Sequence, residues 1–483
     1  MTTSHGNLSK SYIVHSIISV ALMIGGGFLS PIGGITEYGM KVLGIFIGVV
    51  YAWCFVEFIW PSLLAMLLLS FSGYGTLTNI FAEGMGNQIV TQLIFTFIFI
   101  GIISDTGLTD YLAKWFITRK FCNGKPWVLT LTMLYAALII GGFIHVFAAV
   151  LVLWAVFYSI CENVGFKKGE HYVAFMVMGF MGMAQAATVF LPFLPMSIIY
   201  YGLTCQIVGN VTLPNIGWWI LGLVFTVLLP IVYTLLGKFI FKFDLSKMQG
   251  VDMNAFVKVE KMTKEQKYAM ALLVMFISIL VLPGVMTDCV LKTVLSGLSV
   301  LGAASIGLVL FCCLRTRENK KVFNFSKAAA KGLSWDVVVM LVATVPISSA
   351  FESADTGILS TIIGSLMPYF TDMGAVLFVI TTCIVLCIVT QFVHNMVLLI
   401  AVMPTLAGVC MNLGIDPILY VILLSAALNL AMVTPGASVQ AALAFGQIAW
   451  LEKKDGIIFG TLVAVSGMLV ILCVGLPLGL MLW

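Results

Sequence analysis

The sequence has few charged residues for its length. Only 9% of its 483 residues are charged, whereas 61% are hydrophobic, and the mean hydropathy is +1.12. A soluble domain carries roughly 25% charged residues, so this composition excludes an ordinary soluble protein. Successive apolar runs reach or exceed the ~20 residues that a helix needs to cross a bilayer. The sequence therefore predicts an all-α polytopic membrane protein, with the lipid bilayer around it.

The sequence also lacks the motifs of several other function classes. Its net charge of +4 is small, and no basic stripe with interleaved aromatic residues indicates a nucleic-acid partner. The eleven cysteines show no CxxC or Cys/His spacing for a metal site, so we expect them to be packing residues. No HExxH or GxSxG motif lies in an apolar stretch. An intramembrane enzyme is therefore a distant alternative, and no cofactor is expected.

Positive charges are unevenly distributed between the apolar stretches. Lys and Arg gather at residues 114–125, 238–267 and 315–331, whereas 71–85 and 205–215 have none. Because cytoplasmic loops carry the excess of Lys and Arg, the first group is placed in the cytoplasm and the second outside. Counting spans from this assignment predicts a cytoplasmic N-terminus and an external C-terminus. The plasma (inner) membrane of a bacterium is the expected location.

Span lengths divide the chain into five predicted segments. They are N-terminal scaffold helices (1–89), a first repeat (90–241), a cytoplasmic linker (242–266), scaffold helices of the second half (267–332) and a second repeat (333–483). In the first repeat, residues 126–163 are too long for one span and too short for two. We predict a re-entrant hairpin there, entering from the cytoplasm, and a second hairpin over 374–411, entering from outside.

Three short matches relate the two halves at nearly constant spacing. They pair Asp105-Thr-Gly with Asp355-Thr-Gly, His145 with His394, and Gly165 with Gly414, at offsets of 250, 249 and 249 residues. Because the hairpins are predicted to enter from opposite faces, the repeat is inverted. Such repeats are typical of secondary transporters, which expose one midplane site to each side in turn.

Two histidines lie in the middle of apolar sequence, at these matching positions. The segments read Gly-Phe-Ile-His145-Val-Phe and Gln-Phe-Val-His394-Asn-Met. An ionisable side chain at membrane depth is costly and indicates a functional site. With an unperturbed pKa near 6.5, a histidine can donate to a carboxylate or carry a coupled proton. The alternative is a neutral imidazole that only bridges backbone groups at the hairpin tip.

The span after each hairpin contains a polar, helix-breaking patch. The first is Gln185-Ala-Ala-Thr188-Val-Phe-Leu-Pro192, and the second runs from Asn429 through Thr434-Pro435-Gly436-Ala-Ser438. Proline removes a backbone N–H and glycine relaxes the backbone, so we predict two broken transmembrane helices. A kinked helix without a ligand is the alternative. The predicted substrate-binding residues are His145, Val146, Thr188, His394, Asn395, Thr434, Gly436 and Ser438.

This layout resembles the divalent anion/sodium symporters, the dicarboxylate and citrate transporter type within the ion-transporter superfamily. The resemblance covers nearly the whole chain, and the segments Gly39-Met-Lys-Val-Leu-Gly-Ile-Phe and Ile59-Trp-Pro-Ser-Leu share it. Members carry Ser-Asn-Thr at each hairpin tip, which contacts a substrate carboxylate and helps to bind sodium. Here the tips read His145-Val-Phe and His394-Asn-Met, so only Asn395 of the six motif residues is present.

The resemblance implies a secondary active transporter of carboxylate-bearing organic anions, of the di- or tricarboxylate class. It further implies coupling to sodium, elevator-type alternating access and a homodimer, and the two histidines make a proton the alternative coupling ion. A second sodium site looks partly retained and a first looks degraded; their residues are Thr390, Val393, Asn395 and Val433 (second) and Gly141 and His145 (first). Anion exchange, inorganic anion transport and cation/proton antiport remain alternatives.

Overall fold

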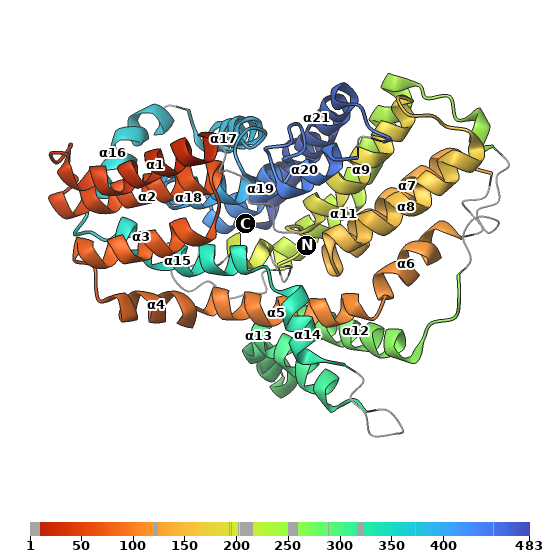
Figure 1. Ribbon diagram of the computed structural model, residues 1–483, viewed down its shortest axis with the longest axis horizontal. Coiled ribbons are helices and arrows are strands. Elements are labelled where there is room, and N and C mark those ends of the chain that lie inside the picture. The colour runs from red at the N-terminus through yellow and green to blue at the C-terminus, as the bar shows by residue number, and fades with distance from the viewer. Residues whose placement is uncertain are drawn as a thin grey trace.

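The computed structural model describes most of the chain as a bundle of helices (Figure 1). The described residues are 10–119, 124–192, 194, 196–200, 202, 216–249, 259–287, 289–315, 323–371, 373–447 and 449–483. No strand occurs within these ranges. Parts of the predicted cytoplasmic linker (250–258) and the whole of 205–215 lie outside them.

The first half contains ten described helices. They are α1 (Lys10–Gly25), α2 (Glu37–Phe55), α3 (Ile59–Ser72), α4 (Leu77–Gly86), α5 (Gln88–Asp105), α6 (Leu108–Ile117), α7 (Pro126–Phe143), α8 (Val146–Val164), α9 (His171–Ala187) and α11 (Ile216–Leu236), the last continued by a π-helical turn at Gly237–Phe241. A short helical segment over 196–200 follows the end of α9.

The second half contains eleven described helices. They are α12 (Lys264–Val285), α13 (Val290–Cys313), α14 (Phe325–Gly332), α15 (Trp335–Glu352), α16 (Ile358–Thr371), α17 (Ala375–Val389), α18 (Asn395–Asn412), α19 (Pro417–Leu428), α20 (Val439–Phe445), α21 (Lys453–Val470) and α22 (Leu476–Leu482). A π-helical turn at Ile471–Gly475 joins the last two.

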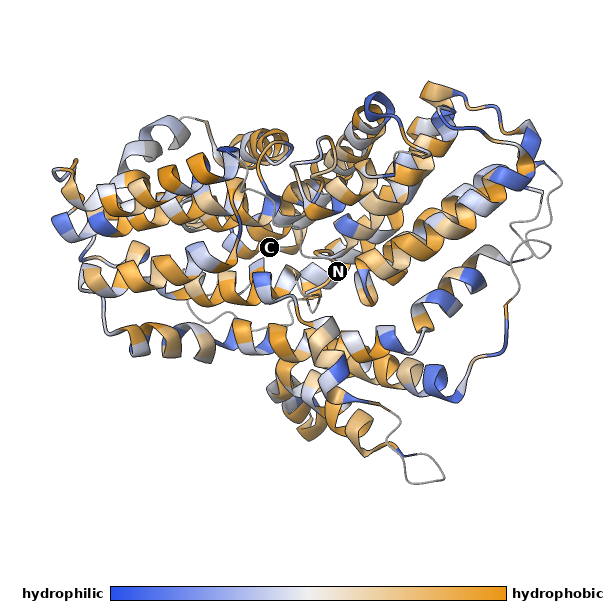
Figure 2. Cartoon of the chain, viewed as in Figure 1, coloured by the Kyte–Doolittle hydropathy of each residue, from blue (hydrophilic) through white to orange (hydrophobic). Residues whose placement is uncertain are grey.

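The helices have the length and the surface of membrane spans. Among the described residues, eight helices are long and apolar enough to cross a bilayer, and ten if each of two bent helix pairs is one span. Hydrophobic residues predominate along the helices (Figure 2). Many large apolar residues are exposed, and Phe28, Phe71 and Met481 are at least 75% exposed. Water would penalise such a surface, whereas lipid does not. The prediction of an all-α polytopic membrane protein is confirmed.

The Asp-Thr-Gly matches form the same turn in both halves. Thr106 and Thr356 each donate their hydroxyl to the carbonyl three residues earlier, both at 2.7 Å. Gly107 and Gly357 then adopt positive φ values of 74° and 65°, where a Cβ would clash with the backbone. The two turns end α5 and α15 and start α6 and α16. The sequence did not predict α6 and α16, because these two helices are too short to span a bilayer.

Each predicted hairpin corresponds to two successive helices, α7 and α8 in the first half and α17 and α18 in the second. Only Ile144 and His145 separate α7 from α8, whereas residues 390–394 separate α17 from α18. Both second helices end alike, because Phe166 and Ile415 donate to Cys161 and Cys410, again 249 residues apart. Each hairpin packs against the helix that follows it, α9 or α19. The side from which each hairpin enters the membrane stays a prediction.

The predicted helix breaks are present as well. Helix α9 ends at Ala187, and residues 429–438 separate α19 from α20. The two broken helices meet, because α20 packs against α9 between the hairpins (Figure 1). The breaks and both hairpin tips are thereby brought to one region.

The other helices exchange partners between the two halves. Helix α5 of the first half packs against α12, α13 and α14, and α15 of the second half packs against α2, α3 and α4. Helices α5 and α15 also contact each other. This reciprocal packing is what a two-fold repeat produces, and it joins the halves outside the hairpin region.

The glycines that end α8 and α18 offer a test of the repeat. At Gly165 (φ 84°) and Gly414 (φ 73°) the Cβ of an alanine would have no neighbouring atom within 4 Å, so only backbone strain opposes the substitution. We expect Gly165→Ala and Gly414→Ala each to cost about 1–2 kcal/mol and to lower the apparent melting temperature of the purified protein. Gly364→Ala, within α16 and equally uncrowded, is the control. Equal melting temperatures for all three variants would contradict this.

Candidate functional site

One cavity lies where the two hairpin tips and the two helix breaks meet. Its volume is about 310 Å³. Its walls come from both tips, from the middle of α5 and from the first turns of α15 and α20. The polar residues along it are His145, Thr188, Ser334, Asp336, His394, Asn395, Asn429 and Gln440. Five of the eight predicted substrate-binding residues line it: His145, Val146, Thr188, His394 and Asn395.

The first tip is fixed by its own histidine. His145 is the N-cap of α8, and its Nδ1 accepts a hydrogen bond from the Ala148 N–H at 3.3 Å. Such a cap satisfies one of the N–H groups that have no helical partner. The ring lies 5.8 Å from that of Phe147, between centroids. The first tip is therefore compact, and one nitrogen of its histidine has a structural role.

The histidine of the second tip is placed differently. His394 is the N-cap of α18 but makes no capping hydrogen bond. Its Nδ1 is buried and has no hydrogen-bond partner among the described residues. The ring meets Phe58 edge to face, with 5.5 Å between centroids. Because burying an unpaired polar atom is costly, a ligand that forms a hydrogen bond with this nitrogen would remove that cost.

The N-termini of three long helices face the cavity, and the short helix α20 also begins there. The first residues of α8 (Val146, Phe147), of α18 (Asn395, Met396) and of α15 (after Ser334) all line it. The first N–H groups of a helix lack intrahelical partners, and the helix dipole adds partial positive charge. The geometry therefore supplies positive potential without a cationic side chain. No Lys or Arg is among the lining residues that the structure describes.

One acidic side chain lines the cavity, and sequence reasoning missed it. Asp336 is exposed and lies in the first turn of α15. The sequence places it at the end of a span, a common position for a carboxylate, so it carries no signal of its own. Only the packing of α15 brings it to the cavity. It would attract a cation and oppose a second negative charge.

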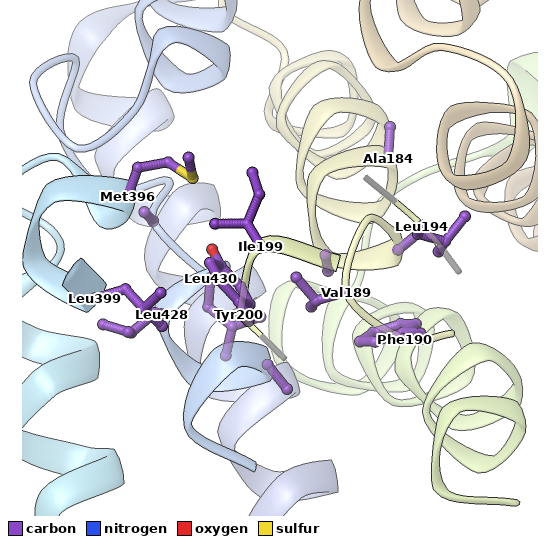
Figure 3. Close-up of a cluster of buried hydrophobic side chains, with 14 of the residues drawn as sticks. Ala184, Val189, Phe190, Leu194, Ile199, Tyr200, Met396, Leu399, Leu428 and Leu430 are labelled. Carbon is purple, nitrogen blue, oxygen red and sulfur yellow. The ribbon is translucent and has the colours of Figure 1, made fainter. Parts of the chain in front are cut away.

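A chain of amides and a phenol crosses from one half to the other. Asn395 Nδ2 donates to Asn429 Oδ1 at 3.3 Å, and Asn429 Nδ2 donates to the Tyr200 hydroxyl at 2.7 Å. Tyr200 follows the first helix break and lies beside Leu428 and Leu430, which flank Asn429 (Figure 3). All three polar residues are buried. Asn429 of the second break thus holds Asn395 in place, and Tyr200 of the first half holds Asn429.

The other predicted substrate-binding residues do not line the cavity. Ser438 donates its hydroxyl to the Ala431 carbonyl at 2.9 Å and lies 3.1 Å from Gln185 Oε1. Thr434 donates to the Gln391 carbonyl, and Gly436 is exposed. Their roles in binding stay predictions, and in this structure they organise the second break.

The residues of the predicted second sodium site lie close together. Thr390 is buried and donates its hydroxyl to the Leu428 carbonyl at 3.4 Å. The N–H of Val433 donates to the side chain of Gln391, and Val393 N–H donates to the Val389 carbonyl. Asn395 donates its side-chain N–H to Asn429 and its backbone N–H to the Ala437 carbonyl, and both acceptors belong to the second half. Whether sodium binds there stays a prediction.

The predicted first sodium site contains a close helix contact. A Cβ on Gly141 would lie 2.5 Å from the Cβ of Ala184, so no side chain fits at this position. Gly142 meets Ala187 in the same way, at 2.9 Å. Gly141 therefore lets α7 approach α9, and of the residues named for this site only His145 carries a polar side chain. No group of three or more His, Cys, Asp or Glu in the described ranges could hold a metal ion.

Comparisons with known proteins agree with this architecture. The Alcanivorax borkumensis YdaH transporter, solved by crystallography, matches 83% of this chain and 87% of its own, with a TM-score of 0.55 and 13% identity. At that identity the match shows the fold alone. A search of curated proteins found no match.

Broken helices that meet at one central cavity are typical of secondary transporters. A family model described as a citrate transporter matches residues 47–319, more than half of the chain. The chain belongs to this citrate transporter family. It is a multi-pass membrane protein, and the resemblance drawn from its sequence is confirmed at this level.

The bond between Asn429 and Tyr200 can be tested by removing one hydroxyl. Tyr200→Phe leaves one N–H of the Asn429 amide without its acceptor, while the other contact of that amide, to the Ser425 carbonyl, remains. We expect a loss of about 1 kcal/mol of stability, seen as a lower apparent melting temperature. Tyr369→Phe, on an exposed residue of α16, is the control. A shift of the same size in both variants would show that the buried bond is not special.

Proposed function

We propose that the protein carries carboxylate-bearing organic anions of the di- or tricarboxylate class across the membrane, coupled to a cation gradient. The observation that carries this proposal is the convergence of three helix N-termini on one cavity. Unpaired backbone N–H groups bind carboxylates as they bind phosphate or sulfate. The family's description as citrate transporters supports the same substrate class.

The size and lining of the cavity fit a small polyanion. A volume of about 310 Å³ is at the lower end of the range for small-molecule sites, roughly 300–1,000 Å³. His145 and His394 add donors at opposite tips, so two carboxylates of one molecule can each meet a different half of the protein. Phe58 and Met396 form apolar wall between them, which suits the carbon skeleton.

The charges along the cavity support coupling to a cation. Helix dipoles supply only partial charges, about half an elementary charge each, and Asp336 opposes the substrate. A cation that enters with the anion offsets this repulsion. A substrate carboxylate beside the unpartnered Nδ1 of His394 would stabilise the protonated imidazole, which makes a proton the first candidate for that cation. Sodium at Thr390, Val393, Asn395 and Val433 is the alternative.

The repeat supports an elevator-type movement. The hairpins and broken helices form one packed group, α7–α9 with α17–α21, and α2–α5 with α12–α15 form another through their exchanged partners. The cavity lies where the groups meet, because Phe58, Phe97 and Val337 line it from the second group. Sliding one group along the other would expose the cavity to each side in turn. A homodimer anchored by the second group belongs to the same proposal.

Uptake by proteoliposomes tests the proposal. Radiolabelled succinate, citrate and a monocarboxylate would be offered with sodium and proton gradients imposed separately. We expect citrate or succinate to accumulate with an inward proton gradient, and His394→Ala to abolish the accumulation. Sodium-driven uptake that is lost in Thr390→Ala or Asn395→Ala would favour the sodium site. Uptake that needs only internal anion would indicate an exchanger, and no uptake of any compound would contradict the substrate class.

Asp336 separates coupling from anion binding. Asp336→Asn removes the negative charge from the cavity and should leave anion exchange intact or faster, because repulsion of the substrate falls. Accumulation driven by the cation gradient should drop by about tenfold or more, the factor that 1.4 kcal/mol represents. Asp110→Asn, outside the cavity and paired with Lys114, is the control. Loss of exchange and accumulation together would show that Asp336 does not act through the cation.

A further inference from the structure

The break between α19 and α20 contains backbone groups that no helix satisfies. Residues 429–438 are non-helical within a buried region, where Leu430, Ala431 and Met432 are almost fully inaccessible. Free backbone N–H and C=O groups at membrane depth are tolerated only where protein or ligand supplies partners. In broken transporter helices the free carbonyls commonly coordinate a cation. The partners of this break therefore bear on how the transporter is coupled.

A single side chain from the second hairpin tip satisfies much of this break. Gln391 Oε1 accepts hydrogen bonds from the N–H groups of Met432 and Val433, both at 3.0 Å. Its Nε2 donates to the carbonyls of Leu430 at 3.2 Å and Cys387 at 2.7 Å. The Gln391 residue is 5% exposed. One amide thus serves two donors and two acceptors at once.

The neighbouring carbonyls of the break have side-chain donors as well. The Leu428 carbonyl accepts from the Thr390 hydroxyl, and the Ala431 carbonyl accepts from Gln185 Nε2 at 3.4 Å and from Ser438. Gln185 belongs to α9, so the first half contributes to the second break. The carbonyls of residues 428, 430 and 431 all point to donors fixed in the protein.

We propose that the Gln391 amide, supported by Gln185, stands in the place of a bound cation at this break. Its two N–H donors meet carbonyls that would otherwise attract an ion, and its oxygen holds the N–H groups that a cation would repel. The hairpin tip and the break are then locked together without sodium. One consequence of this inference rests on the proposed function: in a coupled transporter, the driving cation would bind in the cavity rather than at the break.

Gln391 is on this account a positioning residue. It lies four residues before Asn395, whose N–H donates to the Ala437 carbonyl at 3.3 Å on the far side of the same break. The two contacts fix both ends of the tip that carries His394. Loss of the Gln391 amide would loosen the tip, and a cation would be able to replace it.

The test is the effect of sodium on the melting temperature of purified protein, with choline chloride as the reference salt. Gln391→Glu keeps an oxygen for the two N–H groups but places a carboxylate oxygen against the Leu430 and Cys387 carbonyls. We expect sodium to leave the wild-type melting temperature unchanged and to raise that of Gln391→Glu. Gln249→Ala, on an exposed residue, should behave as wild type. This measurement needs no substrate, so it decides the inference even where the proposed transport fails.

Transport gives the second measurement. Gln391→Ala is expected to lose roughly tenfold in uptake in choline medium, about what one or two hydrogen bonds represent, and to recover part of it in sodium medium. Wild-type uptake should be equal in both media. Sodium stabilisation of the wild-type protein that Thr390→Ala removes would overturn the proposal. So would a Gln391→Glu protein whose melting temperature is the same in both salts.

Discussion

The requirement that every backbone polar group at membrane depth finds a partner shapes this molecule more than any other constraint. A continuous helix meets it internally, but a transporter must interrupt helices to build a site. Three of the interruptions are closed by a particular side chain: His145 caps α8, Thr188 donates to the Gln185 carbonyl at 2.7 Å, and Gln391 spans the second break. The cavity is the space that remains where these closed interruptions meet.

The two halves share a backbone plan but not a chemistry. Their turns at Gly107 and Gly357 and their helix ends at Gly165 and Gly414 agree residue for residue. At the tips, by contrast, the Nδ1 of His145 accepts the capping hydrogen bond of α8, whereas the Nδ1 of His394 has no partner in the described part of the chain. A site built from such halves can bind one end of a ligand through fixed donors and the other through a titratable group.

The sequence predicts the helices, hairpins and breaks because those features are local. Span length, Pro435 and Gly436 and the repeated Asp-Thr-Gly segment each act on the backbone within a few residues. The site depends on long-range packing, and there the sequence reveals less. Asp336 enters the cavity only because α15 packs across the halves, and Asn429 meets Tyr200 from 229 positions away. Gln391 and Gln185 look like ordinary polar residues near a break until their partners are known.

A transporter must also release what it binds, and the charges of this cavity serve that need. A buried Lys or Arg would hold a polyanion strongly through a full charge in low dielectric. Helix N-termini offer partial charges distributed over several N–H groups, so the proposed anion would be bound through many weaker contacts that hydration can replace. With Asp336 opposing the proposed anion, tight binding would require a cation to be present, and departure of that cation would weaken the whole complex. A carboxylate within an anion site is therefore consistent with coupled transport, since it makes each ion's binding depend on the other.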